Sequence, residues 1–189
     1  MTTQADFNSI QSVQMYPDEV EYMIDVIKNM PENGLFVEWG SGGSTCMWLN
    51  NLKPTQSLVS IEHNIEWFNK VNQAIKESFP PEVHSRFTYI YEPERGGYKH
   101  TYACVEEENP FGLWRYMLPN EEILDGDVFF VDGIARGATV ALILLKRKKP
   151  DSLVFIHDYT GRESAYSWIS QICDVETVGQ TLVKLTFKK

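Results

Sequence analysis

The chain has 189 residues, a hydrophobic fraction of 43% and an aromatic fraction of 13%, which is the size and composition of one globular domain. Its formal net charge of −9 disfavours binding to a phosphate backbone, so we expect no nucleic-acid partner. No apolar run approaches the ~18 residues of a membrane span. The polar stretch 1–16 shows no secretory signal, and Cys46, Cys104 and Cys173 form no metal-binding pair. We therefore expect a cytoplasmic protein without a membrane partner, and the sequence leaves its oligomeric state open.

Short runs of β-branched and aromatic residues alternate with longer amphipathic segments, a pattern typical of an α/β fold with a parallel sheet. The pattern predicts helices beginning at Pro17 and over residues 44–52, 65–79, 135–149 and 163–172. It predicts strands over residues 35–39, 57–62, 86–91, 127–132 and 153–157, and a final antiparallel hairpin with strands near Val175 and over 182–187.

Between about residues 92 and 122 the periodicity fails, and the segment carries aromatic residues such as Tyr98, Trp114 and Tyr116. A connector of this length in a compact domain is usually a binding loop or a lid. A small satellite core over the edge of the sheet is an equal alternative. Because no repeat or linker divides the chain, we expect a single domain, residues 1–189, that carries this insertion.

The strongest local signal is the run Glu38-Trp39-Gly40-Ser41-Gly42-Gly43-Ser44-Thr45, between the first predicted strand and its helix. Glycine allows a tight turn and a close approach of a ligand to the backbone, and the N–H groups that begin the helix can hold a carboxylate or a phosphate. The dinucleotide fingerprint requires Gly or Ala where this chain has Thr45, and Glu38 would bring negative charge toward a pyrophosphate. S-adenosylmethionine, which carries an ammonium and a sulfonium, suits Glu38 better. On this basis we expect Gly40→Val to abolish cofactor binding while the protein stays folded.

A second acid, Glu62, ends the second predicted strand. A carboxylate at this place can accept hydrogen bonds from both ribose hydroxyls, and His63 would follow it along the adenine. Taken alone, Glu62 is better explained as a water-exposed acid at a strand end. Its position relative to the glycine-rich run favours ribose binding.

With these two motifs the sequence resembles the class I S-adenosylmethionine-dependent methyltransferases, in element order over about residues 35–187. The resemblance implies a Rossmann-like seven-stranded sheet, mostly parallel with one antiparallel strand and with helices on both faces. It also implies that residues 40–44 hold the methionine part of the cofactor and that the adenine lies near His63, Tyr91 and Glu92. The chain departs from many members in having Gly43-Ser44 where they show x-Gly. We expect cofactor contacts from Glu38, Gly40, Ser41, Gly42, Gly43, Ser44, Thr45, Glu62, His63 and Asp132.

Two further strand ends carry polar residues, Asp132 after the fourth strand and His157-Asp158 after the fifth. The strand order of this family would bring all three together beside the sulfonium. Methyl transfer to a hydroxyl requires alignment of the oxygen and removal of its proton. We expect His157 or Asp158 to be the base, with its partner orienting it, and Asp132 to complete the catalytic set. The plain alternatives are that Asp132 caps a helix and that His157 is hydrogen-bonded in the rim of the sheet.

The acceptor is indicated by a weaker likeness. Asp132-Gly133 looks more like the O-methyltransferases than like the Asn/Asp-Pro-Pro-Tyr/Phe sequence of amide and base N-methyltransferases. The run 154–162 is similar to the Val-Phe-x-His-Asp-x-x-Arg stretch of glucuronoxylan-type sugar O-methyltransferases. This resemblance implies a small-molecule or carbohydrate acceptor, which Arg136, Tyr159 and Arg162 would bind. Surface ion pairs are the alternative role for the two arginines.

Three alternatives stay open from the sequence. Asp132 and Asp158 stand where catechol-type O-methyltransferases place magnesium ligands, but Tyr159 follows where those enzymes usually have Asn, so we expect no metal. An NAD(P)-dependent oxidoreductase is disfavoured by the missing third glycine. A non-catalytic nucleotide-binding regulatory domain is disfavoured by the retained polar set Asp132, His157 and Asp158.

Overall fold

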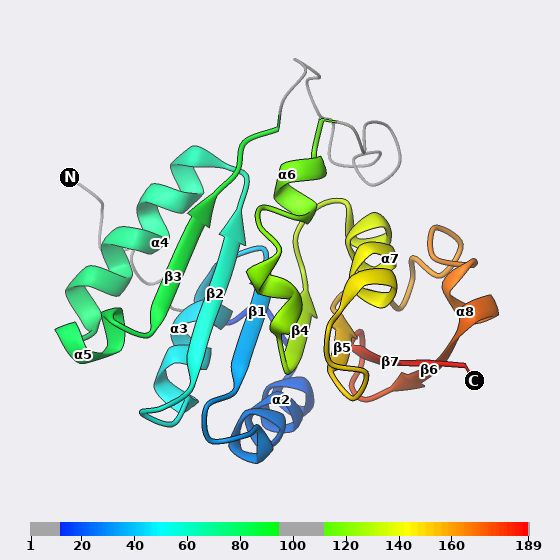
Figure 1. Ribbon diagram of the computed structural model, residues 1–189, viewed down its shortest axis with the longest axis horizontal. Coiled ribbons are helices and arrows are strands. Elements are labelled where there is room, and N and C mark those ends of the chain that lie inside the picture. The colour runs from blue at the N-terminus through cyan, green and yellow to red at the C-terminus, as the bar shows by residue number, and fades with distance from the viewer. Residues whose placement is uncertain (1–11, 95–111, 189) are drawn as a thin grey trace.

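The computed structural model describes residues 12–94 and 112–188, so most of the expected insertion and Cys104 lie outside the described residues. Seven strands form one sheet in the order β3-β2-β1-β4-β5-β7-β6 (Figure 1). The strands are β1 (Leu35–Trp39), β2 (Ser57–Glu62), β3 (Phe87–Tyr91), β4 (Val128–Val131), β5 (Leu153–Ile156), β6 (Cys173–Thr177) and β7 (Val183–Phe187). Only β7 runs against its neighbours, β5 and β6. The predicted fold class, with its one antiparallel strand and its final hairpin, is confirmed.

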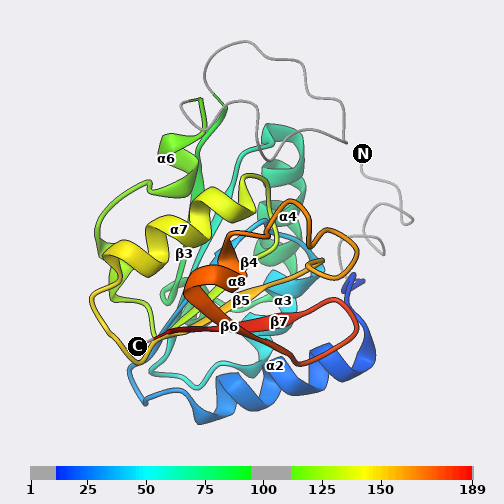
Figure 2. The ribbon, with the colours of Figure 1, turned by 90° about the vertical axis from the view of Figure 1, so that its right-hand side faces the viewer.

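Helices cover both faces of this sheet. The described helical segments are α2 (Pro17–Asn29), α3 (Gly43–Asn51), α4 (Ile65–Ser78), α5 (Pro81–His84), α6 (Trp114–Met117), η1 (Glu122–Asp125), α7 (Arg136–Lys146) and α8 (Ile169–Ile172). Figure 2 shows α6 and α7 on one side of the sheet and α3 and α4 on the other. None of the helices in the described ranges is long and apolar enough to cross a membrane.

Alternate residues of the strands supply two separate cores, as expected for a sheet covered on both faces. In β1, Phe36 packs with α2, α3 and α4, whereas Val37 and Trp39 pack with α6, α7 and α8. In β4, Phe130 faces the first group and Phe129 the second. Because both cores reach the central strands, the ends of β1, β2, β4 and β5 are held in fixed positions.

Two helix predictions are wrong in extent. The helix expected over 163–172 is reduced to α8, because residues 159–166 form successive tight turns around Gly161, whose φ is +87°. The helix expected over 135–149 ends at Lys146, since Arg147 is already extended ahead of Pro150. Pro80 and Pro81 stop α4 as predicted, but they also open the short α5, which the sequence reading missed.

Glu38, at the end of β1, ties the central sheet to the helix that follows it. Its carboxylate is fully buried and accepts hydrogen bonds from four side chains: Ser44 (2.7 Å), Thr45 (2.7 Å), Trp48 (2.8 Å) and Ser60 (2.7 Å). Burial raises the pKa of Glu38 to about 7, although these four bonds act in the opposite direction. The carboxylate therefore holds the start of α3 against β1 and β2.

This network predicts a pH-dependent stability. The folded-state pKa of Glu38 lies above its ordinary value of 4.5, so the contribution of this group is fully present at low pH and is lost as the pH rises through about 7. We expect the unfolding free energy of the wild type to fall by about 3 kcal/mol between about pH 5 and pH 9. Glu38→Gln, which cannot titrate, should abolish this fall. Urea unfolding at a series of pH values measures this difference. The control is Glu21→Gln on the exposed side of α2, which should keep the wild-type pH dependence. An unchanged pH dependence in Glu38→Gln would contradict the assignment.

Candidate active site at the carboxyl edge of the sheet

The glycine-rich loop after β1 lies against the loop after β4. Gly40 has φ +88° and donates its N–H to the carbonyl of Ile61 at 3.0 Å. A Cβ at Gly40 would lie 2.6 Å from the backbone nitrogen of Gly133. The expectation that Gly40→Val leaves the fold intact is therefore wrong, because any side chain here needs both an unfavourable φ and displacement of neighbouring backbone.

The other residues of the loop differ in what they face. A Cβ at Gly42 would meet only the Trp67 ring, at 3.8 Å, so the surface at Gly42 is open. Gly43, in contrast, packs closely against the backbone of Ser12 and Val13. Thr45 accepts a hydrogen bond from the N–H of Gly42 at 2.9 Å and donates to Glu38. Glu38, Ser44 and Thr45 thus shape the loop from behind it, and Gly42 presents its free face.

Glu62 ends β2 and its carboxylate is nearly buried. One oxygen accepts the N–H groups of His63 and Asn64 at 2.8 Å, and the other accepts the N–H and the hydroxyl of Ser41 at 3.2 and 3.1 Å. Burial alone would raise the pKa of Glu62, but the bonds from His63, Asn64 and Ser41 outweigh it and lower the pKa below the ordinary value. Glu62 is therefore an ionised acceptor attached to the glycine-rich loop.

Tyr116 of α6 fills the space between the loops that follow β2 and β4. Its ring is fully buried and meets the His63 ring edge-on, with centroids 5.5 Å apart. The indole of Trp39 donates to its backbone carbonyl at 3.0 Å. A Cβ at Gly133 would overlap the Tyr116 hydroxyl, so the close fit requires glycine at this position. The sequence pattern placed Tyr116 in the aromatic insertion without indicating this position.

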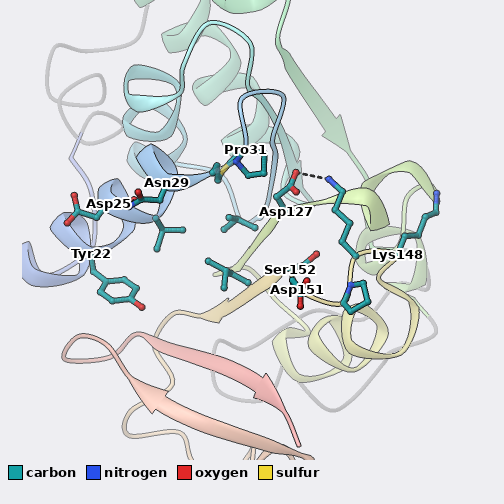
Figure 3. A pocket seen from close by; sticks show the side chains of 14 residues that line it. Tyr22, Asp25, Asn29, Pro31, Asp127, Lys148, Asp151 and Ser152 are labelled. Atoms are coloured by element: carbon teal, nitrogen blue, oxygen red, sulfur yellow. Dashed lines mark hydrogen bonds and ion pairs between the residues drawn. The ribbon is translucent and has the colours of Figure 1, made fainter. Parts of the chain in front are cut away.

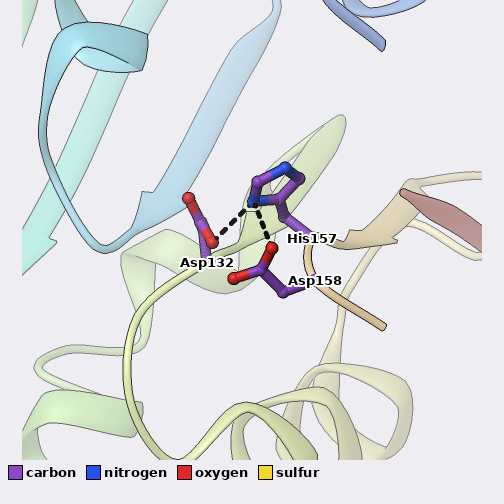
Figure 4. A group of neighbouring side chains, drawn as sticks. All are labelled: Asp132, His157 and Asp158. Atoms are coloured by element: carbon purple, nitrogen blue, oxygen red, sulfur yellow. Dashed lines mark hydrogen bonds and ion pairs between the residues drawn. The ribbon is translucent and has the colours of Figure 1, made fainter. Parts of the chain in front are cut away.

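The structure brings Asp132, His157 and Asp158 together, as the sequence predicts (Figure 4). Nδ1 of His157 lies 2.9 Å from Asp132 and 3.8 Å from Asp158. Asp158 has φ +53°, a conformation that non-glycine residues seldom adopt outside functional or tightly held sites. The helix after β4, α7, has Ala135 as its N-cap residue and no side-chain cap, so Asp132 does not serve as its cap.

A fourth member of the cluster, Glu19, comes from the first turn of α2. Its carboxylate is fully buried and lies 3.3 Å from Nε2 of His157. In the sequence, Glu19 is one of the acids expected at a helix N-terminus and is 138 positions from His157. No local pattern pairs the two, and only the tertiary structure reveals the contact.

The buried side chain of Arg136 bridges the ends of β4 and β5. Its guanidinium donates to the backbone carbonyls of Asp132, Gly133 and His157, and lies 3.3 Å from each of the Asp132 and Asp158 carboxylates. Arg136 is buried, whereas Arg162 is half exposed and lies 3.6 Å from Asp158. Tyr159 is buried and stacks on Tyr166. Of the three residues expected to bind substrate, only Arg162 presents an exposed side chain.

The charge balance at this edge bears on the metal alternative. The donor atoms of Asp132, His157 and Asp158 lie within 4.8 Å of one another, close enough to share one ion. However, the Arg136 guanidinium already contacts both aspartates, and a divalent cation there would be repelled by it. The geometry thus favours neutralisation of the aspartates by protein cations.

An open hollow of about 830 Å³ lies elsewhere, between α2 and the turn that joins α7 to β5 (Figure 3). It reaches the amino ends of β4 and β5, and its lining includes Asp127 and Lys149, which form an ion pair at 2.7 Å. Lys148 pairs with Asp125. Lys148 and Lys149 are thus each paired with an acid, and this hollow is separate from the polar cluster at the carboxyl edge.

No protein-family model matches the chain, and no curated protein matches it. Solved structures do match. A proposed O-methyltransferase from Klebsiella pneumoniae has a TM-score of 0.67 at 11% identity, over 100% of this chain and 92% of that chain. An SAH-bound methyltransferase from Podospora anserina has a TM-score of 0.60 at 15% identity, over 92% of this chain and 83% of that chain. A methyltransferase from Geobacter sulfurreducens has a TM-score of 0.59 at 13% identity, over 94% of this chain and 80% of that chain. The chain therefore has the Rossmann-like fold of the class I methyltransferases.

Proposed function

We propose that this chain is an S-adenosylmethionine-dependent methyltransferase that methylates a hydroxyl oxygen of a small-molecule or carbohydrate acceptor. The observation that carries the proposal is the convergence, at one sheet edge, of the glycine-rich loop, the ionised Glu62 and the cluster Asp132-His157-Asp158. The shared fold supports the reaction class, and the likeness of residues 154–162 to sugar O-methyltransferases supports the acceptor class. The free, buried Cys46 and Cys173 are consistent with a reducing compartment such as the cytoplasm.

The residues around the loop fit the proposed cofactor. The open face at Gly42 and the N–H groups that begin α3 suit its carboxylate. Glu62 stays ionised near neutral pH and can exchange its bond from the Ser41 hydroxyl for bonds from ribose hydroxyls. When bound, the cofactor supplies an electrophilic methyl group. Glu38 contributes by holding the loop, since its own carboxylate is turned away from the surface.

Asp132 is the best candidate to take the proton from the acceptor hydroxyl. Because β4 is the direct neighbour of β1, Asp132 stands next to the glycine-rich loop, and its N–H donates to the carbonyl of Trp39 at 2.8 Å. Its side chain is partly exposed, whereas both ring nitrogens of His157 face carboxylates and the ring is 3% exposed. His157 then orients Asp132, and Asp158 with Arg162 faces the acceptor.

Cofactor binding depends on Glu62 in this proposal. We expect calorimetry to detect binding of S-adenosylmethionine and S-adenosylhomocysteine but not of NAD, and Glu62→Gln to weaken the binding about tenfold, or ~1.4 kcal/mol. The control is Glu66→Gln, an exposed acid in the first turn of α4, which should bind as the wild type does. Wild-type protein that binds neither nucleoside at millimolar concentration would overturn the proposed function.

The buried Tyr116 ring competes with a nucleoside that extends from Glu62 past His63. Replacing it with a smaller apolar residue, Tyr116→Leu, lowers the free energy needed to open this space, so we expect S-adenosylhomocysteine to bind several-fold more tightly. Trp114→Ala is the control, because Trp114 lies on the same helical turn but is exposed. Weaker binding in Tyr116→Leu would instead make the ring part of the cofactor site.

Proton removal by Asp132 predicts a specific kinetic defect. With labelled cofactor and a panel of sugars and uronic acids, Asp132→Asn should lower kcat at least about 100-fold, in the range usual for loss of a general base, with cofactor affinity nearly unchanged. Addition of a chelator should leave the wild-type rate unchanged, because Arg136 and His157 supply the positive charge at the aspartates. Full activity in Asp132→Asn contradicts the assignment of the base, and loss of activity on chelation contradicts the metal-free site.

A further inference from the structure

Glu19 is held in a single orientation by donors from two segments. The N–H of Tyr16 donates to one oxygen at 3.0 Å, and the other accepts the N–H groups of Thr181 and Leu182 at 2.6 and 2.8 Å and the Thr181 hydroxyl at 3.0 Å. Burial alone would raise the pKa of Glu19, but the bonds from Thr181, Tyr16 and Leu182 outweigh it and lower the pKa. An ionised carboxylate with no exposed surface is therefore fixed beneath His157.

The acids around His157 require both ring nitrogens to carry a proton. Nδ1 faces Asp132 at 2.9 Å and Nε2 faces Glu19 at 3.3 Å, and Asp158 lies near the Nδ1 side. A neutral imidazole would turn the lone pair of one nitrogen toward a carboxylate oxygen, which is repulsive. Figure 4 shows that the second nitrogen points away from both aspartates, so Glu19 is its partner in the described structure.

The remaining neighbours of the ring do not change this conclusion. Arg136, the only other charged group that the described structure brings to this residue, contacts the backbone carbonyl of His157. The Phe130 ring stacks beside the imidazole, with centroids 6.1 Å apart. Burial alone would lower the pKa of His157, but Asp132, Asp158 and Glu19 outweigh it and raise the pKa.

We propose that Glu19 is a positioning residue, which holds the His157 ring with both N–H groups donating, so that Nδ1–H fixes the Asp132 carboxylate for proton removal from the acceptor. Glu19 contacts no reacting atom and acts only through His157. The same carboxylate ties α2 to the residues before β7, so α2 and the last hairpin together set the geometry of the site. The kinetic part of this inference rests on the proposed methyl transfer, whereas the protonation of His157 does not.

The protonation is tested by NMR titration of the four histidines in isotope-labelled protein, with His157 assigned from a His157→Gln variant. We expect His157 in the wild type to stay doubly protonated above its ordinary pKa of about 6.5, and Glu19→Gln to lower its pKa by at least about one unit, a tenfold loss of proton affinity. Thr181→Val is the matched control, because it removes one donor to Glu19 but keeps the charge. Its His157 should titrate as in the wild type.

The kinetic arm compares Glu19→Gln and Glu19→Asp with the wild type. Glu19→Gln should lower kcat about tenfold at neutral pH and shift the pH profile while leaving KM for the cofactor unchanged, and Glu19→Asp, which restores the charge, should recover part of the rate. A wild-type His157 that titrates near pH 6.5, or a Glu19→Gln variant with unaltered His157 titration, overturns the inference. The wild-type titration decides the matter even if Glu19→Gln does not fold. Absence of cofactor binding would refute the proposed function alone and leave the NMR result to decide the role of Glu19.

Discussion

The parallel pairing of β1 with both β2 and β4 is the constraint on which the candidate site depends. Parallel neighbours end at the same edge of a sheet, so the residues that follow these strands meet there whatever their distance in the sequence. The pairing brings Gly40 against Gly133 and Glu62 against Ser41. Side chains on both faces bury the strands, and the edge therefore has little freedom to rearrange.

Three buried acids, each satisfied by hydrogen-bond donors, hold the parts of the site together. Glu19, Glu38 and Glu62 are all nearly or fully buried, yet each carboxylate accepts several hydrogen bonds from neighbouring backbone or side-chain donors. A buried carboxylate without such donors would cost several kcal/mol. These three acids hold α2, α3 and the loop after β2 in place, whereas Asp132 and Asp158 are partly exposed.

Tyr116 fills the space between the loops that follow β2 and β4. Its ring meets the His63 ring and lies against Gly133, beside the place where the proposed function puts the nucleoside. A side chain that occupies a binding space reduces the apparent affinity by the free energy of its displacement.

The sequence by itself determined the order of the strands and of the longer helices, because hydrophobic periodicity and glycine positions are local signals. It also determined that Glu38, Glu62, Asp132 and His157 stand at strand ends, since each directly follows or closes a buried β-type run. Helix boundaries were predicted less well where turns replaced a helix, as at 163–168. Successive turns with i→i+3 hydrogen bonds and a helix are formed by similar mixtures of polar and apolar residues, so the sequence pattern does not separate them. Only the tertiary structure decided which way these side chains point. It turned Glu38 inward, paired Glu19 with His157 across 138 residues and placed Tyr116 beside His63, because contacts between distant segments depend on packing that no local pattern encodes.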